Sequence, residues 1–126
     1  MMNFSSFVRK IGLAIASLLF VVGSLFITAS PAAADTVTVK MGSDSGQLVY
    51  VPEVVTIKVG DTVKWVNNKN MPHNVIVIDH PELSYKALAL KPKVELESTF
   101  TEAGEFSYYC SPHRGAGMVG KVIVEG

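Results

Sequence analysis

The sequence contains a single cysteine, Cys110, among its 126 residues. One cysteine excludes an internal disulfide, which small exported domains often use to stabilise a small core. The 11 basic and 11 acidic residues balance each other, so the chain has neither the basic character of a nucleic-acid-binding protein nor an acidic tail. Residues 35–126 also lack helical periodicity and internal repeats, which argues against a helical bundle or a repeat protein.

Charged side chains are absent between Lys10 and Asp35, and this gap contains the apolar run 11–27. Basic residues, an apolar run and then small residues are typical of a secretory signal peptide. We therefore expect the first 34 residues to be removed after Ala34 and residues 35–126 to form one domain. An uncleaved membrane anchor is the alternative, but no charge cluster that would stop transfer follows the run.

Residues 35–126 alternate apolar and polar side chains in short segments that turn residues separate about every ten positions. Alternation with period two is typical of half-buried strands. Seven or eight such strands predict an all-β fold, a two-sheet antiparallel sandwich with Greek-key connections, and a barrel is the alternative. The segment 79–93 is the least regular, although residues 80–82 can open a short helical turn. Trp65 takes an apolar position of its strand, so we expect it in the core.

Three possible metal donors lie in the segment 108–118, namely the thiol of Cys110, the imidazole of His113 and the thioether of Met118. A second histidine, His73, lies at the start of another expected strand. Because the loops at one end of a sandwich converge, the two segments can meet. One thiolate, two imidazoles and a weak thioether are the ligand set of blue-copper electron-transfer sites.

Each donor also has a purely structural explanation. Cys110 alone is typical of a buried, inert thiol, and Met118 alone is typical of core packing. An enzyme with Cys110 as nucleophile and a histidine as base is a further alternative, but neither segment contains a carboxylate to orient that base. A copper storage or delivery protein would favour paired thiols or methionine-rich tracts. The joint spacing of the four donors therefore favours a copper electron carrier.

The segments Tyr108 to Lys121, Pro72-His73-Asn74 and 41–48 resemble the plastocyanin family, and the resemblance covers essentially all of residues 35–126. Pseudoazurins share the cysteine-to-methionine spacing and are the alternative, as periplasmic electron carriers. They carry a helical extension after the methionine, whereas this chain ends eight residues past Met118.

The resemblance to the plastocyanins implies an electron carrier, not an enzyme, with a cupredoxin sandwich of eight strands. It implies one copper ion that cycles between Cu(I) and Cu(II), bound by His73, Cys110, His113 and Met118. Asn74 is implied to support the copper site, and Pro72 and Pro112 to stiffen the two ligand loops. Gly115 and Gly117 are expected to let the loop before Met118 turn tightly.

Two partner surfaces are implied by the same resemblance. One is apolar and surrounds the exposed edge of the His113 ring; it comprises Leu48, Pro72, Pro112, Gly115 and Ala116. The other centres on Tyr109, which precedes the ligand cysteine. The sequence has no run of consecutive acidic residues of the kind found in plant members. Arg114 matches cyanobacterial members instead, which suggests a positive charge at the partner contact; an ordinary solvated arginine is the alternative.

The implied partners are cytochrome f as electron donor and photosystem I as electron acceptor, with a soluble c-type cytochrome as a functional substitute for the carrier. The implied location is the thylakoid lumen, where the protein acts as a monomer with transient contacts at the membrane surface. The short export signal fits a cyanobacterial precursor better than a plant one. His80 receives no role and is expected in a solvated loop.

Overall fold

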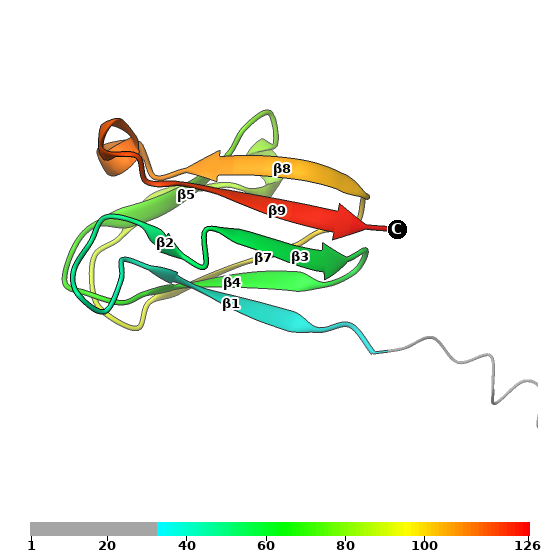
Figure 1. The fold of residues 1–126 in the computed structure, drawn as a ribbon, viewed down its shortest axis with the longest axis horizontal. Coiled ribbons are helices and arrows are strands. Elements are labelled where there is room, and N and C mark those ends of the chain that lie inside the picture. The colour runs from blue at the N-terminus through cyan, green and yellow to red at the C-terminus, as the bar shows by residue number, and fades with distance from the viewer. Residues whose placement is uncertain (1–32) are drawn as a thin grey trace, which may run out of the picture. The chain divides into compact units, whose positions relative to one another are not determined.

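The computed structural model describes residues 33–126. Residues 1–32, most of the expected export signal, lie outside this range, so cleavage after Ala34 stays a prediction. The described part folds into nine strands and two short 3-10 helices (Figure 1). Neither helix in this part of the chain is long and apolar enough to cross a membrane.

The strands form one four-stranded and one five-stranded sheet. In sheet order, the four-stranded sheet contains β2 (Tyr50–Val51), β1 (Thr36–Met41), β4 (Thr62–Asn67) and β7 (Glu95–Thr99). The five-stranded sheet contains β3 (Val54–Lys58), β9 (Val119–Glu125), β8 (Gly104–Tyr109), β5 (His73–Val77) and β6 (Tyr85–Ala89). The helices are η1 (Pro81–Leu83) and η2 (Ser111–Ala116). The two-sheet, all-β sandwich predicted from the alternation is confirmed.

Two strand pairs are parallel, β1 with β4 and β3 with β9, and the other pairs are antiparallel. The sheets are therefore mixed, whereas the sequence predicted antiparallel sheets. Alternation indicates which face a side chain takes, but it carries no information about the direction of the neighbouring strand. The chain leaves the first sheet after β2 and returns to it after β3, and such crossings bring strands that are distant in sequence together in parallel.

The core lies between the two sheets and follows the predicted alternation. In β4, Val63, Trp65 and Asn67 are buried, while the residues between them are half-buried. Trp65 is fully buried, as predicted, and the buried ring of Tyr108 packs edge-on against it with centroids 5.3 Å apart. Burying a large apolar side chain contributes roughly 1.5 to 3 kcal/mol, so these residues hold the sheets together.

The segment 79–93 contains more regular structure than the sequence indicated. The predicted helical turn is confirmed as η1, and it is followed by the strand β6, which was not predicted. Residues 86–88 of β6 are all exposed, since the strand lies at the edge of its sheet. An edge strand with little buried surface shows no alternation, and this explains why the sequence pattern missed it.

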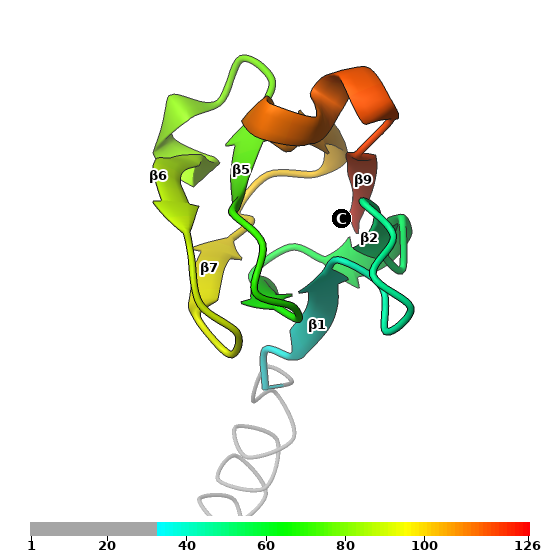
Figure 2. The same ribbon diagram turned by 90° about the vertical axis from the view of Figure 1, so that its left-hand side faces the viewer.

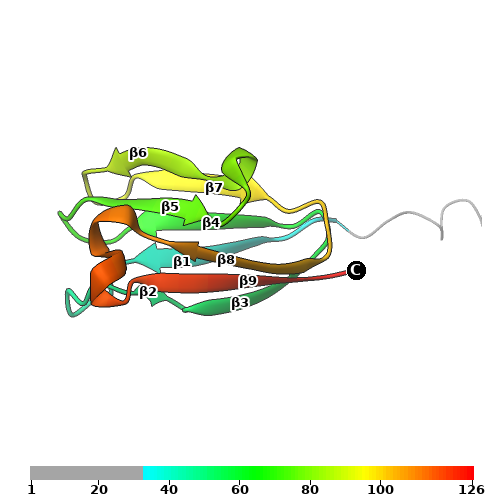
Figure 3. The ribbon, with the colours of Figure 1, turned by 90° about the horizontal axis from the view of Figure 1, so that it is seen from above.

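One end of the sandwich gathers the segments that carry the expected donors. Figure 3 shows η2 and the loop between β1 and β2 at this end, opposite the C-terminus. Figure 2 looks onto the same end, where η2 crosses above the strands. The convergence of loops expected for a sandwich thus brings η2 close to the start of β5.

Candidate metal centre

The donor atoms of His73, Cys110 and His113 meet at this end of the sandwich. His73 begins β5, Cys110 follows β8 directly, and His113 lies in η2. The Cys110 Sγ atom is 3.6 Å from His73 Nδ1 and 3.5 Å from His113 Nδ1. The two Nδ1 atoms are 3.2 Å apart. Three of the four predicted ligands therefore converge, although 37 residues separate the first from the second.

Met118 is drawn into the same loop by the backbone. The Cys110 N–H donates to the Met118 carbonyl at 3.1 Å, and the Met118 N–H donates to the His113 carbonyl at 3.2 Å. These two bonds close the loop on itself, and the Met118 side chain is fully buried. The buried Met118 side chain is therefore a soft, polarizable thioether carried by the same loop as Cys110 and His113.

The arrangement of the three donor atoms fits one soft or borderline metal ion. The atoms lie within 4.8 Å of one another. A point equidistant from all three lies about 2 Å from each, which is close to ordinary metal–imidazole and metal–thiolate bond lengths of about 2.0 to 2.3 Å. Two imidazole nitrogens that face each other and a thiol sulfur provide lone pairs for a cation. The donor set and its spacing therefore suit the copper chemistry expected from the sequence.

Burial adjusts the protonation of the donors. His73 is only 1% exposed, and this burial, together with the neighbouring His113, lowers the pKa of His73 to about 4. Its imidazole is therefore neutral at neutral pH and keeps a free lone pair. Burial also raises the pKa of the Cys110 thiol. A bound cation favours the thiolate form of a coordinating cysteine, so the site gains its thiolate when the metal binds.

Asn74 joins the two ligand segments by hydrogen bonds. Its Oδ1 accepts a hydrogen bond from the Ser111 N–H at 2.8 Å, and its Nδ2 donates to Ser111 Oγ at 3.1 Å. Nδ2 also donates to the Lys86 carbonyl at 3.1 Å, and the Tyr50 hydroxyl donates to the Asn74 carbonyl at 2.7 Å. A residue next to His73 thus holds the residue that follows Cys110.

Prolines and glycines shape the loops around the donors. Pro72 precedes His73, and Pro112 lies in the first turn of η2 directly before His113. Gly117 ends η2 in the left-handed conformation with φ +88°, as the expected tight turn requires. Gly115 is not among the residues with positive φ. The expectation that both glycines are needed for the turn is therefore wrong for Gly115, since it lies within the helical turns of η2.

Two residues that support the site, Gly42 and Asn67, were not identified from the sequence. Gly42 has φ +92°, and a Cβ atom there would lie 3.3 Å from His73 Nε2. Asn67 is buried, and its Nδ2 atom lies within hydrogen-bond distance of the carbonyls of Met71, Ala89 and Lys91. Asn67 stands at an apolar position of the alternation in β4. A polar residue at such a position is the signal that could have identified it.

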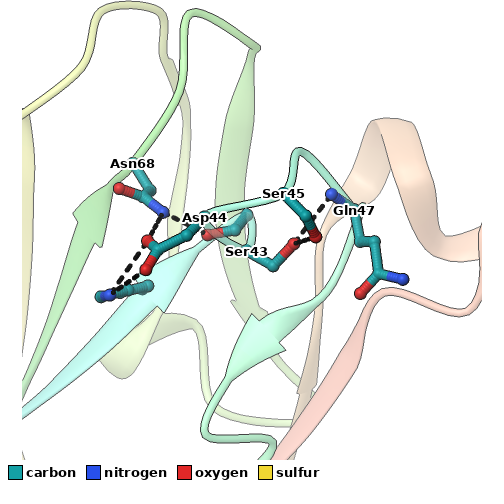
Figure 4. Close-up of polar contacts among 7 residues, drawn as sticks. Ser43, Asp44, Ser45, Gln47 and Asn68 are labelled. Carbon is teal, nitrogen blue, oxygen red and sulfur yellow. Dashed lines mark hydrogen bonds and ion pairs between the residues drawn. The ribbon is translucent and has the colours of Figure 1, made fainter.

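The loop before Leu48 is held by a polar network (Figure 4). The Asn68 amide donates to Asp44 Oδ1 at 2.8 Å and to the Gly42 carbonyl at 3.0 Å. Lys40 pairs with Asp44 at 3.0 Å from the other side, and the Gln47 N–H donates to Ser43 Oγ at 2.9 Å. The network fastens the 42–47 loop to the segment that leads to His73.

The remaining predicted residues lie at or near the surface. His113 is half-buried, as are Leu48 and Pro72, whereas Pro112, Gly115 and Ala116 are exposed. Tyr109 is half-buried, and the exposed Arg114 places its guanidinium 3.9 Å from the centroid of the Tyr109 ring. Tyr108, on the opposite face of the strand, is buried. Of the two tyrosines before Cys110, Tyr109 is thus the one that reaches solvent.

His80 is half-buried rather than free in a solvated loop. Its ring packs edge-on against Phe106, with centroids 4.9 Å apart, and its Nδ1 atom lies 2.8 Å from Glu82 Oε1. His80 directly precedes η1, and the strand β5 separates it in sequence from His73. The expectation of a solvated loop is therefore only partly right for this residue.

Comparisons with known proteins agree with this geometry. The family of copper binding proteins described as the plastocyanin/azurin family matches residues 37–125. A plastocyanin of Synechococcus sp. (strain JA-2-3B'a(2-13)) is 52% identical, over 94% of this chain and 95% of that protein. A plastocyanin of Nostoc punctiforme is 41% identical, over 97% of both chains.

The fold also matches solved structures. A mutant plastocyanin of a fern has a TM-score of 0.66 at 20% identity, and the match covers 71% of this chain and 100% of that one. That likeness supports the cupredoxin-like sandwich alone. The family match and the converging donors together give a single copper site formed by His73, Cys110, His113 and Met118. The chain therefore belongs to the plastocyanins, the electron carriers within the plastocyanin/azurin family of copper binding proteins.

Proposed function

We propose that this protein carries single electrons from cytochrome f to photosystem I in the thylakoid lumen. The observation that carries the proposal is the half-buried ring of His113 among exposed apolar residues at the copper end of the sandwich. Membership of the plastocyanins supports partners in photosynthetic electron transfer. A soluble c-type cytochrome would be a functional substitute for this carrier between the same two partners.

The chain's own residues hold the donors in nearly fixed positions. When bound, copper supplies a one-electron couple between Cu(I) and Cu(II). His73 and Cys110 are attached to neighbouring strands of one sheet, and Asn74 fastens the loop that carries His113. Fixed donors require little rearrangement when the charge of the site changes by one, and this favours rapid electron transfer.

The two imidazoles differ in their access to solvent. His73 is 1% exposed, whereas His113 is a half-buried residue. A partner can therefore approach the site closely through His113. We infer that the electron leaves and enters by this ring, the shortest route from the donors to the surface.

The surface around His113 suits a brief encounter. Its expected members, Leu48, Pro72, Pro112, Gly115 and Ala116, carry no charge. An uncharged patch allows close approach, and a small interface allows rapid release. The network around Asp44 and Asn68 supports the loop that presents Leu48 at this surface.

Tyr109 and Arg114 form the second proposed contact. The guanidinium stacks on the Tyr109 ring. The groove beside them is also lined by Val119, by the basic Lys121 and by the acidic Glu53. Stacking of this kind is attractive by about 0.5 to 1 kcal/mol at exposed sites. It holds a positive charge near Cys110, where a negatively charged partner surface can be recognised.

Flash-induced reduction of photosystem I by the reduced protein tests the proposal. Replacement of Leu48 by glutamate should lower the second-order rate constant, because a charge then enters the apolar contact, while the reduction potential stays close to that of the wild type. Thr101→Glu adds the same charge to the turn between β7 and β8, far from the donors, and serves as the control. Equal rates for both variants would contradict docking through the apolar surface.

Export after Ala34 is part of the same proposal. The basic residues, the apolar run and the small residues before Asp35 support it. Intact mass of the protein purified from the lumen tests the cleavage directly. A mass that corresponds to residues 35–126 is expected, and a mass that retains the apolar run would contradict it.

A further inference from the structure

Asp61 carries a buried carboxylate far from the copper site, in the turn between β3 and β4. Its Oδ1 accepts a hydrogen bond from the Asp35 N–H at 2.9 Å, and its Oδ2 accepts one from the Lys58 N–H at 2.9 Å. The four ion pairs found among residues 33–126 do not include Asp61. Asp61 is only 8% exposed as a residue, and its partly buried carboxylate thus has two amide donors and no salt-bridge partner among the described residues. Buried charges are normally paired.

The position of the Asp35 nitrogen is fixed by the strands around it. The Asp35 carbonyl accepts a hydrogen bond from the Thr62 N–H at 2.9 Å. The parallel pairing of β1 with β4 begins one residue later, at Thr36 opposite Thr62. Asp61 itself is held because its N–H donates to the Lys58 carbonyl at 3.0 Å. The nitrogen and the carboxylate therefore face each other across two anchored segments.

We propose that Asp61 is a binding site for the amino group that export creates at Asp35. Hydrolysis of the Ala34–Asp35 amide bond by a signal peptidase consumes one water molecule, whose oxygen forms a C–O bond at the Ala34 carbonyl carbon while the C–N bond breaks and a proton passes to the Asp35 nitrogen. Ala34 leaves as a carboxylate, and the Asp35 nitrogen becomes an amine that takes up a proton at neutral pH. The neutral amide donor of the precursor becomes an ammonium group hydrogen-bonded to Asp61.

Cleavage adds a positive charge to a contact that the fold already makes. In the precursor the charged carboxylate accepts a hydrogen bond from a neutral amide, whereas after cleavage the donor is itself charged and the two opposite charges attract each other directly. The Asp35 amide and then the Lys58 amide hold the pKa of Asp61 below its ordinary value, and the Lys58 charge adds to this effect. The carboxylate is therefore charged when the new amine forms. The exported precursor lacks this pair, so the fold gains the added stability only after cleavage.

The inference rests on the proposed cleavage after Ala34, and a double-mutant cycle tests it. Residues 35–126 contain the whole core, and a fern plastocyanin chain of this extent is a folded protein. Reduced, copper-loaded protein of residues 35–126 is compared with residues 34–126, where Ala34 displaces the ammonium group by one residue. The urea midpoint near pH 6.5, where an ordinary amine is protonated, should be higher for residues 35–126.

Asp61→Asn in both chains completes the cycle. The difference between the two midpoints should vanish in the Asp61→Asn background; a difference that survives there, or no difference in the wild-type background, would overturn the inference. If Asp61→Asn fails to fold, the pKa of the Asp35 amine in residues 35–126 decides, measured by NMR. A pKa clearly above the ordinary range of about 7.7 to 8.0 supports the pair, and an ordinary value overturns it. The mass of lumenal protein separately tests the cleavage, so the two failures are distinguishable.

Discussion

Individual residues around the copper site differ sharply in what they contact. His73 is enclosed by the core, and its Nε2 atom faces the backbone of Gly42 so closely that a larger residue there would press on the ring. His113 lies within the short helix η2 and is half-buried. Met118 completes the set from a fully buried position. These differences determine what each substitution should do.

Met118→Gln should retain copper and lower the reduction potential. An amide oxygen is a harder donor than a thioether, so it stabilises Cu(II) relative to Cu(I). We expect a decrease of at least about 59 mV, a tenfold shift of the one-electron equilibrium, in a redox titration. Met71→Gln serves as the control, because Met71 is exposed, whereas Met41 is buried in the core. This control should leave the reduction potential unchanged. An unchanged potential in Met118→Gln would argue against ligation by this residue.

Gly120→Ala should destabilise the sandwich although it adds only one methyl group. A Cβ atom at Gly120 would overlap the ring and hydroxyl of Tyr108, which is itself packed against Trp65. Overpacking of a dense core costs about 1 to 3 kcal/mol. The urea midpoint of the copper-loaded protein measures this loss, and Gly46→Ala, at a turn with no atom near the added Cβ, reports the cost of positive φ alone. A smaller loss in Gly120→Ala than in Gly46→Ala would contradict the packing argument.

Some residue roles could be predicted from the sequence and others could not. The core position of Trp65 follows from alternation, because burial repeats every second residue in a strand. Asn67 occupies an equivalent buried position, but its three carbonyl neighbours come from segments that alternation does not place. The spacing of Cys110, His113 and Met118 indicated a metal loop. The meeting of this loop with His73 depended on the general convergence of loops in a sandwich and on the resemblance to the plastocyanins.

At the scale of elements, the site depends on how β5 and η2 are joined. η2 is a short 3-10 helix without a side-chain cap at its start. The Ser111 N–H at its first residue is instead satisfied by Asn74 of β5. The same side chain reaches the Lys86 carbonyl of β6. One amide thus connects three elements beside the copper ligands.

Asn74→Ala should therefore lower the stability of the fold and weaken the retention of copper. The partly buried hydrogen bond from the Ser111 N–H would be lost, which costs about 0.5 to 1.5 kcal/mol, and copper should pass to a chelator faster than in the wild type. Urea unfolding and the rate of copper transfer measure the two effects. Ser111→Ala removes only the Oγ contact and keeps the bond from the Ser111 N–H. If both variants lose equal stability and release copper equally fast, the amide does not join the elements as described.

The sequence predicted where most strands occur better than it predicted how the strands pair. Most strands were predicted where they occur, since their buried faces repeat regularly. The parallel pairs β1 with β4 and β3 with β9 were not, because partner direction depends on long connections. β6 was missed since the edge of a sheet leaves its side chains exposed on both faces.

At the scale of the whole molecule, charge and exposure are distributed unevenly around the copper end. The apolar surface proposed around His113 has no charged member, whereas Arg114, the residue that follows His113, stacks on Tyr109. A carrier of this kind must find its partner by long-range attraction and then bind through a small uncharged area. We propose that the two surfaces provide these two steps separately.

Arg114→Glu should slow electron transfer to photosystem I, mainly at low salt. Reversal of the charge replaces attraction by repulsion, and we expect a loss of roughly tenfold or more at low ionic strength. The difference should shrink toward 1 M salt, where the screening length is about 3 Å. Lys58→Glu makes the same reversal at the end of β3, away from the donors. An equal effect of both variants at every salt concentration would leave Arg114 as a solvated side chain without a docking role.

The visible absorption spectrum of residues 35–126 with Cu(II) shows directly whether the four predicted ligands form a redox-active copper site. A thiolate bound to copper in the site of His73, Cys110, His113 and Met118 should give an intense visible charge-transfer band. We expect this band to disappear on reduction with ascorbate and to return on oxidation, and we expect Cys110→Ser to abolish it in protein that remains folded. Folded, copper-treated protein that shows no such band would contradict the copper site and the electron-carrier function built on it.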